Sequence, residues 1–145
     1  MNYILEAILV GTYTCFIYLL FSPFIKNFYY LLLVVGFFKH FLGSSLQIHD
    51  WYCNNGETCL KVLSQDQTYE ANTIYLLRDS LLEAMLFLVV GFILSTYFFC
   101  YSFLKSKELT NSVLFFTIGF ILHIISEKLL VHKYFCKTTC NIETN

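Results

Sequence analysis

Four long runs of apolar residues dominate the sequence and limit what it can fold into. They span Ile4 to Ile25, Phe28 to His49, Ser80 to Leu104 and Ser112 to His132. Each run reaches the roughly 20 mostly apolar residues that a helix needs to cross a bilayer. Lipid offers the backbone no hydrogen-bond partner, and four strands are too few to close a barrel. We therefore expect each run to be a membrane-spanning helix.

The composition excludes most classes of soluble protein. Of the 145 residues, 57% are hydrophobic and 13% are charged, whereas a soluble domain carries about 25% charged residues. The chain is thus too apolar for an ordinary cytosolic enzyme, a disordered tail or a coiled coil. Its formal net charge of -1, without a basic cluster, also argues against nucleic-acid binding.

The spacing of the four runs predicts two helical hairpins. Only Ser22 to Asn27 separates the first two runs, and Lys105 to Asn111 separates the last two. A longer polar segment, Asp50 to Asp79, joins the hairpins, and within it Leu60 to Leu77 has the composition of a short surface helix. Pro23 lies where the first run ends, as expected of a residue that breaks the helical hydrogen-bond ladder.

The placement of lysines predicts the orientation in the membrane. The two short turns hold Lys26, Lys105 and Lys107, and cytoplasmic segments of membrane proteins favour Lys and Arg. The segments on the opposite side mix basic with acidic residues. We therefore expect the turns in the cytoplasm and both termini outside it. Residues 1–6 lack the basic start of a cleavable signal peptide, so we expect the first run to stay in the mature chain.

The second half of the chain resembles the first. At an offset of 83 positions, Gly36 to Cys53 lies over Gly119 to Cys136 without a gap, and all four histidines pair. At an offset of 77 positions, Leu5-Glu6-Ala7 matches Leu82-Glu83-Ala84, and we assign the six extra residues of the second half to its turn. We interpret the chain as two copies of one two-helix unit, related by an axis along the membrane normal. The alternative is that apolar helices merely share a composition.

These patterns predict an all-α, integral membrane four-helix bundle built from two tandem, parallel-repeat helical hairpins. The expected organisation is a first hairpin over residues 1–53, a cysteine-containing segment outside the membrane over 54–79, a second hairpin over 80–136 and a short polar tail over 137–145.

Four cysteines near the predicted outer surface are candidates for disulfides. They are Cys53, Cys59, Cys136 and Cys140. They form two local pairs along the chain, on the side that faces a disulfide-permissive compartment, although four cysteines allow three connectivities. Redox-active or unpaired thiols are the alternatives. Cys15 and Cys100 lie within expected helices, where cysteine usually behaves as a small buried hydrophobe.

The same ends of the helices offer a candidate zinc site. His49 and Cys53 are four positions apart, as are His132 and Cys136, and this spacing brings two side chains to one face of a helix. Parallel repeats bring both pairs to one depth in the membrane. A zinc ion held by two cysteines and two histidines is therefore an alternative to the disulfides.

Two glutamates near the helix ends are a second group of candidates. Glu6 and Glu83 lie one turn into their helices, on the same side as His49 and His132. Charged groups at membrane depth are costly and often functional, so a relay or substrate site of Glu and His is one hypothesis. The other is that each carboxylate reaches headgroup water.

Further polar residues lie within the second helix of each hairpin. They are Lys39, His40, His123 and Glu127. A single haem with two histidine ligands, His40 and His123, is one alternative, and a hydrogen bond from each histidine to a neighbouring helix is the commoner role. Lys39 and Glu127 suit an ion pair across the helices. Close helix contacts are expected at Gly36, Gly43, Gly91 and Gly119.

Two resemblances bear on function. The run Lys39-His40-Phe41-Leu42-Gly43, followed by Ile48-His49-Asp50-Trp51-Tyr52-Cys53-Asn54, resembles small multi-pass membrane proteins of large nucleocytoplasmic DNA viruses. This likeness covers about one helix and its flank. It implies a place in a viral or infected-cell membrane, such as the internal virion membrane, and it assigns no reaction.

The four spans with two outer cysteine pairs are also similar to disulfide-generating membrane oxidases of the quinone-linked and vitamin K epoxide reductase type. Those enzymes carry a Cys-x-x-Cys motif, which this chain lacks. No active-site residue is therefore transferred from them.

The leading hypothesis is a non-enzymatic membrane protein with a structural or assembly role and no resident cofactor. Disulfides would crosslink the extracytoplasmic ends of its helices. Expected partners are the lipid bilayer, a second copy of the chain, or other membrane or capsid proteins, and not nucleic acid. The alternatives are a membrane thiol-disulfide oxidoreductase and a small metal-binding or transport protein. The last would use Glu6, Glu83, His49, His132, Cys53 and Cys136.

Overall fold

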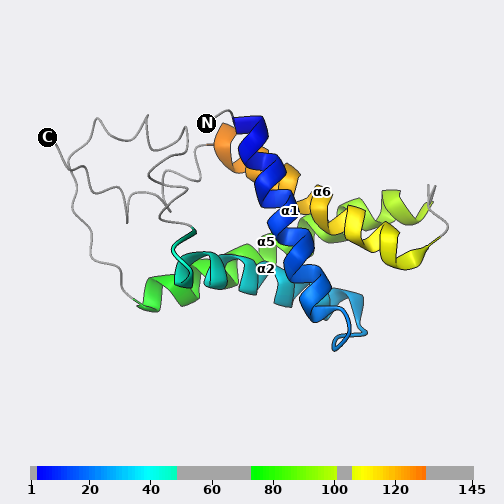
Figure 1. Ribbon diagram of the computed structural model, residues 1–145, viewed down its shortest axis with the longest axis horizontal. Helices are drawn as coiled ribbons and strands as arrows, with labels where there is room; N and C mark the ends of the chain where they lie inside the picture. The colour runs from blue at the N-terminus through cyan, green and yellow to red at the C-terminus, as the bar shows by residue number, and fades with distance from the viewer. Residues whose placement is uncertain (1–2, 49–72, 101–105, 130–145) are drawn as a thin grey trace, which may run out of the picture.

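The computed structural model describes residues 3–48, 73–100 and 106–129, with side chains described throughout except at 73–75 and 99–100. Within these ranges the chain forms helices and no strand. The long helices are α1 (Tyr3–Phe21), α2 (Phe28–Ser45), α5 (Thr73–Cys100) and α6 (Lys107–Lys128) (Figure 1). All four are long and apolar enough to cross a membrane, so the expected all-α class with four candidate spans is confirmed.

The first connection is a tight turn, as expected from its sequence. After α1 ends at Phe21, the chain turns through Pro23. Asn27 then caps α2, because its side-chain oxygen accepts hydrogen bonds from the backbone N–H groups of Tyr29, at 3.0 Å, and Tyr30, at 3.3 Å. Such a cap satisfies N–H groups that the first turn of a helix leaves without partners.

The helices of the second hairpin are longer than the sequence predicted. Helix α5 begins at Thr73 rather than at Ser80, and α6 begins at Lys107 rather than at Ser112. As a result α5 has 28 residues and α1 has 19. Glu108 lies in the first turn of α6, where an acidic side chain favours an earlier start by facing the positive end of the helix dipole. Residues 73–79 and 107–111, which were expected in connecting segments, therefore belong to α5 and α6.

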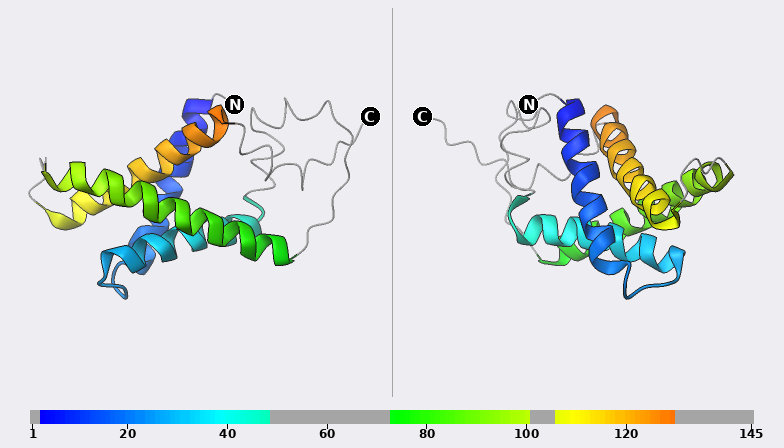
Figure 2. Two further views of the ribbon diagram at one scale, coloured as in Figure 1. Left: turned by 180° about the vertical axis from the view of Figure 1, so that it is seen from behind. Right: turned by 45° about the vertical axis from the view of Figure 1, so that its right-hand side comes forward.

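The most extensive packing joins the two hairpins. Helix α1 packs mainly against α6, and α2 packs mainly against α5, whereas α1 with α2 and α5 with α6 share fewer contacts. Both main pairs are antiparallel, and the two pairs lie across one another (Figures 1 and 2). The hairpins are therefore interlocked, and neither forms a self-contained packing unit.

The core of the bundle lies where the two pairs meet. Its buried apolar side chains come from all four helices: Ile17, Tyr18, Leu31, Leu32, Val35, Phe87, Leu114, Phe115, Ile118 and Leu122. The rings of Tyr18 and Phe115 stack with their centroids 4.5 Å apart. This contact joins the last turn of α1 to α6, and stacking of this kind is favourable beyond the area that it buries.

Small residues allow the helices to approach closely. A Cβ atom added at Gly36 would lie 2.7 Å from Cβ of Phe87 and 2.9 Å from Cα of Ala84, and one at Gly91 would lie 2.5 Å from Leu32. A Cβ at Gly119 would collide with Thr14. These three glycines make the expected close contacts. Gly43 does not, because its nearest neighbour is the Tyr13 ring at 4.0 Å.

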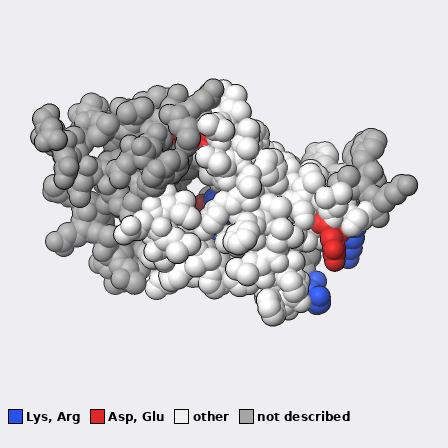
Figure 3. Space-filling model, in the orientation of Figure 1, with Lys and Arg blue, Asp and Glu red and all other residues white. Residues whose placement is uncertain are grey.

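Large apolar side chains cover the outside of the bundle. Phe16 in α1 is 63% exposed, Tyr30 in α2 is 65% exposed and Tyr97 in α5 is 64% exposed. On the face drawn in Figure 3, most charged side chains lie at the right-hand end of the molecule, and a few others are visible near its middle and its upper edge. The described surface between them carries no charge. A water-soluble bundle hides such side chains, whereas a bilayer accepts them.

Candidate functional site

Two clusters of charged side chains lie between the helices, one in each antiparallel pair. The first, which we call the Glu6 cluster, consists of Glu6 from α1 with His123 and Glu127 from α6. The second is the ion pair of Lys39 from α2 with Glu83 from α5. Both occupy places where hydrocarbon side chains would be expected, so each has to compensate for the cost of removing charge from water.

The helical repeat brings the Glu6 cluster together. His123 and Glu127 are four positions apart on α6, so their side chains lie on one face. Because α1 runs antiparallel to α6, its first turn brings Glu6 to the same level. The carboxylate oxygen Oε2 of Glu6 lies 3.6 Å from Nε2 of His123. One ligand atom from each of the three residues lies within 4.8 Å of the others.

The Glu6 cluster is enclosed by protein. The exposed fraction is 1% for Glu6 and 3% for His123, and Glu127 is partly buried. The structure therefore contradicts the hypothesis that the Glu6 carboxylate reaches headgroup water. The side chain points between two helices because α6 supplies polar groups there.

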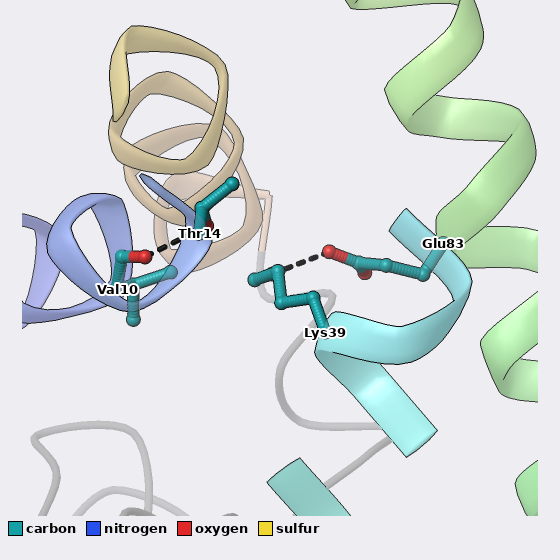
Figure 4. A network of polar contacts seen from close by, with 4 residues as sticks. All are labelled: Val10, Thr14, Lys39 and Glu83. Atoms are coloured by element: carbon teal, nitrogen blue, oxygen red, sulfur yellow. Dashed lines mark hydrogen bonds and ion pairs between the residues drawn. The ribbon is translucent and has the colours of Figure 1, made fainter. Parts of the chain in front are cut away.

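The ion pair in the other half of the bundle is short. The Lys39 ammonium nitrogen donates to Oε1 of Glu83 at 2.5 Å, with the two side chains 16% and 12% exposed. Figure 4 shows the two side chains reaching toward one another from α2 and α5. The same ammonium lies 5.5 Å from the centre of the Phe87 ring, where the negative face of the ring attracts a cation.

The pairing of these charges differs from the pairing expected from the sequence. Lys39 lies against Glu83 rather than against the expected Glu127, and Glu127 lies beside Glu6 and His123 instead. The reason is the interlocked packing: α2 faces α5, and α6 faces α1.

Three buried hydroxyl groups donate to backbone carbonyls one turn earlier in the chain. The Thr14 hydroxyl donates to the backbone carbonyl of Val10 at 2.7 Å, the contact that Figure 4 draws beside Lys39. Ser95 and Thr110 donate in the same way to carbonyls one turn earlier. These residues satisfy their own hydrogen bonds and leave the charged groups as the candidates for chemistry.

The remaining histidine of the described helices is His40, which is partly buried on α2 next to Lys39. His123 faces Glu6 across the other helix pair. A haem between His40 and His123 stays a prediction. The described contacts of His123 favour its alternative role, a polar interaction with a neighbouring helix.

Several candidate residues lie outside the described ranges. They are His49, Cys53, Cys59, His132, Cys136 and Cys140. The disulfides and the zinc site of two cysteines and two histidines therefore stay predictions. Cys15, in contrast, is described: it lies in α1 as a free, partly buried thiol, in keeping with the small hydrophobe expected there.

Sequence reasoning had named every member of the Glu6 cluster without grouping them. The signal that could have joined two of them is the four-residue spacing of His123 and Glu127. Gly11 was missed as a contact residue: a Cβ there would lie 2.9 Å from the Phe116 carbonyl oxygen.

A comparison of the chain with protein-family models, with curated proteins and with solved structures finds no match.

Proposed function

We propose that this chain is a multi-pass integral membrane protein with a structural or assembly role. The observation that carries the proposal is the distribution of polarity in the described helices. Their outward side chains are large and apolar, while the charged groups lie at helix ends or between helices. Lipid is the solvent that stabilises such an arrangement.

The packing supports a role that depends on shape rather than on turnover. Phe87 and Phe115 are fully buried, and close backbone approaches at Gly36 and Gly119 fix the helices against one another. Interfaces of small residues are the usual means of holding helices together in lipid, where hydrophobic association is weak. We propose that the resulting rigid unit presents its apolar outer faces to lipid, to a second copy or to other membrane proteins.

The proposal includes the duplication of a two-helix unit, and the contacts support it. The offset of 77 positions relates α1 to α5, and the offset of 83 positions relates α2 to α6. The repeat therefore relates the pair of α1 with α6 to the pair of α5 with α2, and these are the two main packing pairs. It also converts Glu6 and His123 into Glu83 and His40, and Glu83 contacts Lys39, the neighbour of His40. Gly36 and Gly119, matched in the repeat, each lie against a helix of the other hairpin.

The orientation and the compartment are further parts of the proposal. We place the turns with Lys26 and Lys107 in the cytoplasm and both termini outside, following the excess of lysine in the short turns. A viral or infected-cell membrane is the proposed location, and its support is the resemblance of the segment from Lys39 to Asn54.

Fractionation and labelling test this proposal. The chain should stay in the pellet after an alkaline carbonate wash and enter solution only with detergent. In intact cells or vesicles, a cysteine introduced at Lys26 should resist an impermeant maleimide, and one introduced at Asn145 should react. Release by carbonate would overturn the membrane assignment, and the opposite labelling pattern would overturn the orientation.

The alternative to a structural role is a thiol-disulfide oxidoreductase with a catalytic thiol, and an activity assay distinguishes the two. Purified protein mixed with a quinone and a reduced substrate peptide should form no disulfides beyond the uncatalysed rate. Native mass spectrometry from nanodiscs should at the same time give one defined oligomeric state. Multiple turnovers of thiol oxidation would replace the structural role with an oxidoreductase.

A further inference from the structure

The Glu6 cluster has the composition of a metal site. It combines one imidazole with two carboxylates, and these donors together suit divalent zinc, iron, cobalt and manganese. The donors come from two helices, so they can close on an ion by side-chain rotation alone. Two ligands on a tetrahedral ion at about 2.1 Å lie about 3.4 Å apart, and the separation of Glu6 Oε2 and His123 Nε2 is already 3.6 Å.

The charge within the bundle favours a cation at this place. In the other helix pair, Lys39 compensates Glu83. The Glu6 cluster combines two carboxylates with one imidazole in a largely buried place, and the positive charge of a divalent ion matches this donor set.

We propose that Glu6, His123 and Glu127 bind one divalent transition-metal ion, with zinc as the representative member of the class. Three protein ligands leave a fourth position for water or for a further ligand, as in zinc sites that remain open. The site lies near the start of α1 and the end of α6. This site differs from the predicted site of two cysteines and two histidines, and it does not depend on the proposed structural role.

Metal binding to the full-length chain tests the proposal. Protein purified in detergent, stripped with a chelator and titrated with zinc should bind one ion per chain at this site. Glu6→Gln and His123→Asn should each weaken binding by at least about tenfold. The matched control is His40→Asn, which makes the same change at a histidine of α2 outside the Glu6 cluster and should leave the affinity unchanged.

Cobalt distinguishes this site from one made by cysteines. Cobalt bound to one nitrogen and two oxygens gives weak visible bands, whereas a thiolate ligand adds an intense near-ultraviolet charge-transfer band. We expect the weak bands alone, and their loss in His123→Asn. A charge-transfer band that survives in His123→Asn, or zinc binding unaffected by both Glu6→Gln and His123→Asn, would overturn the proposal.

A folding defect has to be separated from the loss of a ligand. Glu127→Gln provides the second variant, because Glu127 is only partly buried and the amide keeps its shape. It should retain the helical circular dichroism and the oligomeric state of the wild type while binding zinc at least about tenfold more weakly. Unchanged zinc affinity in a folded Glu127→Gln protein would remove Glu127 from the site and overturn the three-ligand assignment.

Discussion

Lys39 and Glu83 are 44 positions apart in the chain, yet the ammonium of one contacts the carboxylate of the other between α2 and α5. The contact joins the second helix of one hairpin to the first helix of the other. Both side chains are mostly buried, so removing either partner leaves a charge in a medium that solvates it poorly.

Replacing Lys39 by methionine should lower the free energy of unfolding by about 3 kcal/mol, because the Glu83 carboxylate then stays buried without its cation. The measurement is reversible unfolding in mixed micelles. Lys128→Met is the control: that lysine is exposed, and its loss should cost less than about 0.5 kcal/mol. Adding Glu83→Gln to Lys39→Met should restore part of the stability. Equal stability of Lys39→Met and wild type would show that the pair is energetically neutral.

Gly36→Ala should destabilise the bundle by about 1–3 kcal/mol, since the added methyl group meets Phe87 and the backbone of Ala84. Gly43→Ala is the matched control on the same helix, because the nearest atoms to its Cβ lie at 4.0 Å. The same unfolding experiment should leave the control near the wild type. If the two variants behave alike, α2 and α5 do not pack as closely as the contacts indicate.

Phe87→Ala and Phe16→Ala should differ strongly, although each removes one phenylalanine ring. Phe87 is fully buried, so its loss creates a cavity that should cost about 3 kcal/mol. Phe16 is 63% exposed, so lipid replaces its ring and the change should stay within about 0.5 kcal/mol. Thermal unfolding in nanodiscs measures both. A larger effect at Phe16 would indicate that its face is covered by another protein.

Thiol counting checks the predicted disulfides. In denatured, unreduced protein we expect the four outer cysteines to be blocked, and two thiols, from Cys15 and Cys100, to react with a maleimide. After reduction, all six should react. Cys15→Ser lowers the unreduced count by one and serves as the internal calibration, because Cys15 is a free thiol in α1. Six reactive thiols before reduction would contradict the disulfide prediction.

The four helices could be predicted from sequence because their apolar runs are long and the bilayer sets one length for all of them. Their ends were harder to place. Polarity in the segment before Ser80 suggested a region outside the membrane, yet α5 already begins at Thr73. A helix can extend beyond an apolar run, since backbone hydrogen bonds along the helix continue irrespective of the polarity of the side chains.

The pairing of the helices could not be predicted, and with it the partners of the charged residues. Helices that are apolar on every side give no periodic stripe to show which face meets a neighbour. The sequence favoured an ion pair between Lys39 and Glu127 across the second helices of the two hairpins, whereas in the structure Lys39 lies against Glu83. The proposed repeat relates Glu6 with His123 to Glu83 with His40, but only the described contacts reveal which helices face one another.

The preference of α1 for α6 has a consequence for biosynthesis. The ribosome releases the first span long before the last one exists, and its principal neighbour is therefore absent during most of translation. Glu6 must meanwhile be sheltered by the insertion machinery or remain close to water. The final span then completes the assembly. A chain truncated before α6 would leave Glu6 without the polar groups of that helix, and we expect quality-control proteases to degrade it.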